Sequence, residues 1–175
     1  MNLSDHFTRE ELEFSATAIR YGIDNSIPEP MLDTWRESLE QIVEPIRKAA
    51  VVPLHVESGY RCEQLNRMIG GSLTSQHRGF YVHLGISYAA CAFDLIPLRN
   101  FQQDGMDKFA LFRIIQNAVE LRALPVDQLI YELGNREEPA WVHVSYVIGL
   151  PPRFDVLRAE LTNGKVIYTP YEEVA

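Results

Sequence analysis

The stretch Trp141-Val142-His143-Val144-Ser145-Tyr146 alternates valines with polar or aromatic side chains, and this alternation decides the fold class that we predict. Successive side chains of a β-strand point to opposite faces. Trp141, His143 and Ser145 would therefore share one face, while the valines would share the other. An imidazole between a tryptophan and a serine suits the floor of a site. The stretch predicts a strand over residues 141–147 with a functional face and a core face.

Other segments predict the strands and helices around this one. Alternating or apolar runs predict strands over 54–58, 89–96 and 128–132, and Asn163-Gly164 predicts a hairpin turn between strands 156–161 and 165–169. Apolar residues at helical spacing predict helices over 31–50, 63–69 and 107–121, the first of them kinked near Pro45. A further helix is expected from a Thr8–Glu11 capping box to Gly22.

Strand-helix-strand units do not repeat regularly along this order of elements. The order therefore predicts an α+β fold, with a small and mostly antiparallel sheet flanked by helices and a site on the sheet face. A length of 175 residues favours a single domain over residues 1–175. We expect the chain to be a monomer.

The charge and hydropathy of the chain exclude several classes of function. A net charge of -8 and a pI of about 5.1, with no basic cluster, argue against binding to nucleic acid or to anionic lipid. No apolar stretch approaches the roughly 20 residues that span a bilayer. The first residues, Met1–His6, are polar and lack the core of a signal peptide. We therefore expect no membrane partner and synthesis in the cytoplasm without a signal peptide.

Three residues form a candidate metal-binding set. His77 ends a loop rich in Gly, Ser and Thr, and such loops often carry site residues. Asp94 lies inside an apolar strand, where a buried carboxylate needs a partner, either a metal or an arginine. With His143, these residues offer two nitrogens and one oxygen, which suits a zinc ion that keeps a fourth position for water.

Five short motifs occur in an order that is typical of one family of zinc peptidases. They are Ser58–Arg61 (SGYR), Leu65–Asn66 with Gly70–Ser72 (GGS), Ser75–His77 (SQH), Ala92–Leu95 (AFDL) and Trp141–Ser145 (WVHVS). With the opening Phe7–Leu12, these motifs make the chain resemble the M15 family over about residues 3–150. That family includes D-Ala-D-Ala carboxypeptidases and phage endolysins. Residues 151–175 would then be a C-terminal hairpin extension.

The resemblance implies roles for individual residues. His77, Asp94 and His143 would be the zinc ligands. Arg61 would bind a carboxylate or carbonyl of the substrate and stabilise charge in the transition state, for which its planar fork is suited. The alternative for Arg61 is a structural salt bridge, for instance to Asp94. Ser75 and Tyr60, which neighbour these residues, are further candidates for substrate binding.

The chain departs from the family pattern at the general base. Many relatives carry a glutamate three residues before the last histidine, where this chain has Ala140. We predict that Glu132, at the end of strand 128–132, replaces it, with Glu138 and Glu137, a histidine or no base at all as alternatives. Loss of a general base costs roughly 10²–10⁴ in rate, so the identity of the base matters.

A second departure is an apparent insertion between the first histidine and the aspartate. Residues 78–93 hold several aromatic residues and would form either a flap over the cleft or a hairpin that packs on the domain. His83, within this segment, is a rival metal ligand. Cys62 and Cys91 flank site residues, and we expect both to be structural thiols rather than ligands, although a disulfide outside the cell is an alternative.

Together these features predict a zinc peptidase that hydrolyses peptide bonds involving D-amino acids in peptidoglycan stem peptides, as a carboxypeptidase or an endopeptidase. The absence of a signal peptide fits a phage-type lysin that reaches the cell wall when the membrane is breached. The first alternative is an inactive module that binds peptide or serves in a virion or wall assembly. The second is a zinc dipeptidase that acts on free dipeptides.

Overall fold

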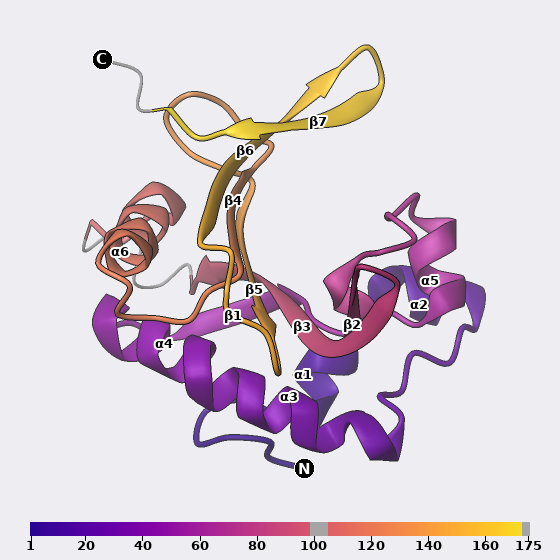
Figure 1. Ribbon diagram of the computed structural model, residues 1–175. Helices are drawn as coiled ribbons and strands as arrows, with labels where there is room; N and C mark the ends of the chain where they lie inside the picture. Colours follow the sequence, from indigo (N-terminus) through magenta and orange to yellow (C-terminus); the bar gives the residue numbers. More distant parts are fainter. Residues whose placement is uncertain (99–104, 173–175) are drawn as a thin grey trace.

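The computed structural model describes residues 1–98 and 105–172 and shows a mixed α+β fold (Figure 1). Within these residues the strands join in the order β1-β3-β5-β4-β6-β7, and β2 pairs with the outer part of β3. The strands are β1 (Leu54–Ser58), β2 (Phe80–His83), β3 (Ile86–Pro97), β4 (Gln128–Glu132), β5 (Trp141–Val147), β6 (Asp155–Thr162) and β7 (Lys165–Pro170). Neighbouring strands are antiparallel, except that β4 and β6 are parallel. The predicted fold class is confirmed.

The helical segments are α1 (Arg9–Glu13), α2 (Ala16–Tyr21), η1 (Glu29–Met31), α3 (Leu32–Ser38), η2 (Leu39–Val43), α4 (Glu44–Ala50), α5 (Glu63–Met68), η3 (Gln76–Arg78) and α6 (Lys108–Glu120). Six of these helical segments precede β1, α5 and η3 lie between β1 and β2, and α6 lies between β3 and β4. In the part of the chain that the structure describes, no helix is both long and apolar enough to cross a membrane.

The helices α3 and α6 cover one face of the sheet. Trp35 of α3 packs edge-on against Phe93 of β3, with ring centroids 5.3 Å apart, and Phe112 of α6 packs in the same way against Tyr131 of β4 at 5.3 Å. These side chains belong to a single large apolar cluster. Because side chains alternate along a strand, residues next to Phe93 in the chain, including Asp94, point to the other face of the sheet.

The segment from Thr8 to Gly22 forms two helices rather than the single helix predicted. The Thr8–Glu11 capping box is present and starts α1. However, Phe14 is extended and ends α1, and the side chain of Ser15 then accepts a hydrogen bond from the backbone N–H of Ala18 and starts α2. A second N-terminal cap therefore divides the segment.

Pro45 does not end the predicted helix over residues 31–50. The helix runs from Leu32 to Ala50, and its middle, η2, is a π-helical turn in which the N–H of Glu44 bonds to Leu39 O. A proline lacks a backbone N–H and crowds the carbonyl four residues earlier. A wider turn directly before Pro45 absorbs that irregularity, and the helix continues to Ala50.

Residues 80–97 form a hairpin in which β2 pairs with the first part of β3, so that β3 is longer than predicted. Leu84 and Gly85 form its two-residue turn, both with positive φ. The predicted segment 78–93 therefore includes a β-hairpin, and its role as a flap over the cleft stays a prediction. The hairpin at Asn163-Gly164 is also present, as predicted, between β6 and β7.

Candidate metal centre

Asp94 and His143 lie directly opposite each other on the paired strands β3 and β5. Their side chains emerge on the sheet face that α3 and α6 leave uncovered, and Asp94 Oδ1 lies 2.9 Å from Nδ1 of His143. Asp94 is 3% exposed and His143 is 8% exposed. The antiparallel register therefore brings together two polar side chains that are 49 residues apart in the sequence.

His77 reaches the same point from outside the sheet. It lies in η3, where its backbone carbonyl accepts a hydrogen bond from the N–H of Arg61. Its Nδ1 lies 2.7 Å from Gly59 O, and its Nε2 lies 3.3 Å from Asp94 Oδ1. Because a carbonyl can only accept, Nδ1 carries the proton and the lone pair of Nε2 faces Asp94. Hydrogen bonding of one ring nitrogen in this way orients metal-binding histidines.

The three side chains fit a metal ion. One ligand atom from each of His77, Asp94 and His143 lies within 4.8 Å of the others, and all three residues are buried. Ligands about 2.0–2.1 Å from a tetrahedral zinc ion lie roughly 3.3 Å from one another. The separations of 2.9 Å and 3.3 Å between Asp94 Oδ1 and the two imidazole nitrogens are close to that spacing.

The protonation of the centre also favours a cation. Burial lowers the pKa of His77 to about 4, in spite of the carboxylate beside it, so its imidazole is neutral near pH 7. Burial works against the charge on Asp94, but the hydrogen bond with His143 counters it, and the pKa of Asp94 lies below the ordinary value. A neutral imidazole and an ionised carboxylate are the states in which these groups bind metals.

Arg61 forms an ion pair with the outer oxygen of Asp94. Its Nη2 lies 2.5 Å from Asp94 Oδ2, and its Nε donates to Ser58 Oγ at 2.8 Å. This is the salt bridge that the sequence left open as an alternative. It leaves Asp94 Oδ1 to the histidines and leaves Nη1 of Arg61 without a partner among the described residues. A role for Arg61 toward substrate stays a prediction.

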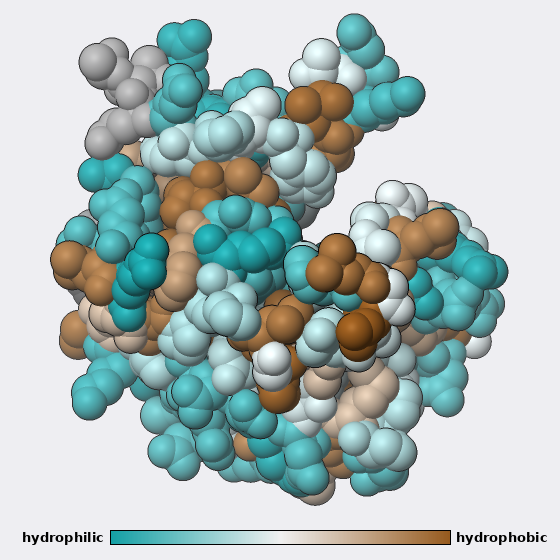
Figure 2. Space-filling model, viewed as in Figure 1, coloured by the Kyte–Doolittle hydropathy of each residue, from teal (hydrophilic) through white to brown (hydrophobic). Residues whose placement is uncertain are grey.

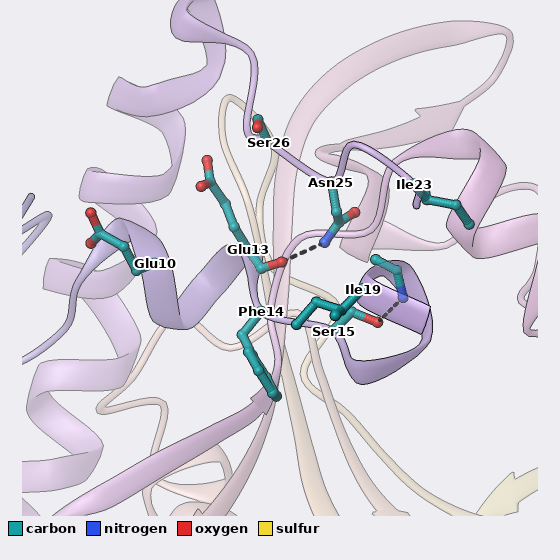
Figure 3. A pocket seen from close by; sticks show the side chains of 9 residues that line it. Glu10, Glu13, Phe14, Ser15, Ile19, Ile23, Asn25 and Ser26 are labelled. Carbon is teal, nitrogen blue, oxygen red and sulfur yellow. Dashed lines mark hydrogen bonds between the residues drawn. The ribbon is translucent and has the colours of Figure 1, made fainter. Parts of the chain in front are cut away.

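The segment that carries Arg61 is held by a buried asparagine. Asn25 Nδ2 donates to the carbonyls of Glu13 and Tyr60, at 2.9 Å each, and its Oδ1 accepts from the N–H of Cys62 at 2.8 Å. The bond to Glu13 is drawn in Figure 3, in a hollow between α1, α2 and the segment 23–26. None of the three candidate ligands lines this hollow.

Glu132 is the carboxylate that β4 brings to the same sheet face. It is opposite Trp141, which lies two residues before His143 on β5, and it is 7% exposed. Burial raises its pKa, and the charge on Asp94 adds to that rise, while His143 and Arg61 oppose it. A carboxylate with a raised pKa is a better proton acceptor near neutral pH.

The two alternative bases lie in other surroundings. Glu138 accepts a hydrogen bond from the backbone N–H of Lys108 and forms an ion pair of 3.3 Å with Nζ of the same lysine. Glu137 is exposed in the loop before β5. These contacts favour Glu132, whose assignment as the base stays a prediction.

The remaining predicted site residues differ in burial and in their distance from the metal centre. Ser75 is half-buried directly before η3, and its hydroxyl makes no capping bond there. Tyr60 packs edge-on against Trp35 in the core and is 8% exposed, which favours a structural role. His83 is exposed on the β2–β3 hairpin and is not part of the ligand cluster.

Both cysteines are free thiols, as the structural interpretation expected. Cys62 caps α5, where its Sγ accepts from the N–H of Leu65. Cys91 is fully buried, and its place three residues before Asp94 on β3 puts it on the opposite face of the sheet. Cys91 therefore does not face the metal centre.

The sequence did not reveal a second polar network beneath the centre. Gln76, which precedes His77, donates from Nε2 to Asp127 Oδ2 at 2.9 Å, and Arg153 Nη2 lies 2.5 Å from the same oxygen. Asp127 is 1% exposed. Asp94 stands out in the sequence as a carboxylate inside an apolar strand, whereas Asp127 directly precedes β4, so a search that included the residues flanking apolar runs would have found it.

The fold and this centre define a protein with a side-chain cluster that could hold a metal ion, as metallopeptidases do. The family model described as Peptidase M15 matches residues 5–97, which is more than half of the chain, and the chain therefore belongs to this family. Peptidases of this family depend on a metal. The matched range contains Arg61, His77 and Asp94, whereas Glu132 and His143 lie beyond it. No curated protein matches the chain.

Proposed function

We propose that the protein is a zinc peptidase that hydrolyses peptide bonds involving D-amino acids in peptidoglycan stem peptides. The observation that carries this proposal is the convergence of His77 Nε2, Asp94 Oδ1 and a ring nitrogen of His143, within 4.8 Å, on the open face of the sheet. A set of three protein ligands is typical of catalytic zinc sites, which keep a fourth position open.

Bound between these ligands, zinc would lower the pKa of a coordinated water to about 7 and polarise a substrate carbonyl. Glu132 would accept the proton from the attacking water and pass it to the leaving amine. Its burial and raised pKa support that role. Asp94 would use Oδ1 toward the metal while Arg61 holds Oδ2.

Arg61 would contact the substrate through Nη1 while its other two nitrogens stay bound to Ser58 and Asp94. A guanidinium anchored in this way loses little further freedom on binding a carboxylate or carbonyl. The hydroxyl of Ser75, which is not used in capping η3, would hydrogen-bond to the peptide backbone of the substrate.

The experiment that tests the proposal measures the metal content of the purified protein and its release of peptides from purified peptidoglycan. We expect about one zinc per chain. His143→Ala should lose both the zinc and the peptide release. His83→Ala, which changes an exposed histidine outside the cluster, is the matched control and should keep both. Equal zinc content in wild type and His143→Ala would overturn the ligand assignment.

An inactive peptide-binding module is the second candidate, and Ala140 is the observation that favours it, because relatives place a catalytic glutamate at that position. The backbone N–H of Ala140 donates to Glu132 O at 2.9 Å. The proposed replacement base, Glu132, therefore lies on the strand next to Ala140. Zinc bound through His143 without peptide release would favour the inactive module.

A further inference from the structure

The β6–β7 hairpin, which lies outside the family match, continues the sheet face that carries the metal centre. Glu132 on β4 is opposite Ala159 on β6, and Ala159 is opposite Tyr168 on β7. Residues opposite each other in register share a face. Tyr168 therefore stands on the same face as Glu132, Asp94 and His143, two strands beyond Glu132.

The hairpin rises from one end of the sheet, on the side where β2 and α5 lie, and the molecular surface is hollowed between them (Figures 1 and 2). Its open face is apolar as well as aromatic. Leu161 and Val166 are opposite each other on the same face as Tyr168, and all three are well exposed. No residue within 1–98 or 105–172 forms a hydrogen bond with the Tyr168 hydroxyl.

The centre acts electrostatically on Tyr168. Partial burial raises the pKa of Tyr168 to about 12, and the negative charges of Glu132 and Asp94 add to the rise, while Arg61 opposes it. The phenol is therefore protonated near neutral pH and can donate a hydrogen bond. The same charges are those that would surround the cleaved bond.

The spacing of strands sets the length of substrate that would reach this tyrosine. Neighbouring strands lie about 4.8 Å apart, so two strand spacings between Glu132 and Tyr168 correspond to about 10 Å. An extended peptide advances about 3.3 Å per residue, so three residues cover that distance. A free dipeptide bound at the metal would not reach Tyr168, whereas a stem peptide would.

We propose that Tyr168 is a substrate-binding residue of this centre and that the β6–β7 hairpin forms a subsite for a peptide that extends about three residues from the cleaved bond. The ring would pack against the peptide, with Leu161 and Val166 beside it, and the hydroxyl would donate to a peptide carbonyl or a carboxylate. This inference rests on the proposed function and assigns the site a peptide longer than a dipeptide.

The test compares zinc-loaded wild type, Tyr168→Ala, Tyr168→Phe and the control Ile167→Ala. Ile167 is exposed on the same strand, and its side chain points to the opposite face. Each protein is titrated with a stem pentapeptide and with the dipeptide D-alanyl-D-alanine, and Kd is measured, or KM where the peptide is cleaved. Zinc content and the midpoint of thermal unfolding show that each variant is folded and loaded.

We expect Tyr168→Ala to raise the Kd for the pentapeptide about tenfold and to leave the Kd for the dipeptide within about twofold. Tyr168→Phe should raise the pentapeptide Kd about threefold, which isolates the hydroxyl. Ile167→Ala should change neither. An equal loss for both peptides, or no loss for the pentapeptide, overturns the inference.

The experiment can reject the proposed hydrolysis and the role of Tyr168 independently of each other. If wild type binds the pentapeptide without cleaving it and releases no peptide from peptidoglycan, the proposed hydrolysis is excluded, and the Kd values still decide the role of Tyr168. If wild type cleaves the pentapeptide and Tyr168→Ala has unchanged KM, the function stands and the inference is wrong. If wild type does not bind the pentapeptide at all, the inference is wrong as well.

Discussion

Asp94 and His143 occupy opposed positions on β3 and β5, and Asp94 uses one oxygen for His143 and the other for Arg61. The carboxylate thus links the two imidazoles of the centre to the guanidinium that lines it. Burying a carboxylate is unfavourable unless its charge is compensated. This one residue consequently holds both the geometry and the charge balance of the site.

Asp94→Asn should therefore remove zinc binding and also destabilise the metal-free protein. The amide keeps the size of the side chain but leaves the guanidinium of Arg61, which is 18% exposed, without a counter-charge. Breaking a buried pair by neutralising one partner costs roughly 3–5 kcal/mol. Chemical denaturation in a chelator would measure the loss. Asp33→Asn, in an exposed pair with Arg36, is the control and should cost less than about 1 kcal/mol.

Glu132→Gln should abolish turnover while keeping the metal. Without the proton acceptor, kcat should fall roughly 10²–10⁴-fold, whereas zinc content and KM should stay close to wild type. Steady-state kinetics with a stem peptide would check this expectation. Glu138→Gln, which changes a carboxylate paired with Lys108, should keep kcat within about threefold, and a larger loss there would move the base to Glu138.

The same substitution should change stability with a defined pH dependence. Burial raises the pKa of Glu132 in the folded state above its unfolded value of about 4.5. Folding is therefore favoured while Glu132 is protonated, and this contribution is lost as the pH rises through the folded pKa. In a chelator, Glu132→Gln should be more stable than wild type at pH 7–8 and similar to it near pH 4. Equal stability at both pH values would show that Glu132 is well solvated.

The fold could be predicted from the sequence wherever a segment has one strong local pattern. Strand 54–58, strand 128–132 and strand 141–147 have the predicted bounds, because each is a short alternating or apolar run. The split at Ser15 was missed because two caps compete within a short helical segment. The β2–β3 hairpin was only one of two alternatives, because its turn carries Leu84, a residue that rarely adopts positive φ.

The site was predicted less completely than the fold, since its residues meet through long-range pairing. The resemblance to the M15 family singled out His77, Asp94 and His143, which the structure brings together. The Gln76–Asp127 hydrogen bond joins residues 51 apart in the sequence, and no local pattern records it. The place of Tyr168 on the site face depends on two strand registers, one of them parallel, which a single sequence does not reveal.

Asp127→Asn should weaken both the fold and the metal centre. Burial works against the charge on Asp127, but hydrogen bonds from Arg153 and Gln76 outweigh burial and lower its pKa. The stabilisation is therefore present above the unfolded pKa of about 3.8 and is lost as the pH falls through the folded pKa. The variant should be less stable than wild type at pH 7 and approach it in acid.

Because Gln76 precedes His77, loss of its partner should also loosen η3 and weaken zinc affinity about tenfold, which a competition titration would measure. Asp155→Asn is the control, since Asp155 pairs with Arg153 at the surface. An unchanged zinc affinity in Asp127→Asn would show that the network serves the fold alone.

Asn25→Ala should destabilise the protein by about 3 kcal/mol, because Asn25 makes three hydrogen bonds in a site that is 6% exposed. Removing the amide leaves the carbonyls of Glu13 and Tyr60 and the N–H of Cys62 without their partners. Tyr60 and Cys62 lie on either side of Arg61. The variant should therefore also raise KM for a stem peptide, through a displaced guanidinium, while zinc content stays at the wild-type level. Ser26→Ala, at an exposed neighbouring position, is the control and should change neither property. A loss of stability with unchanged KM would show that the segment 58–62 keeps its position without Asn25.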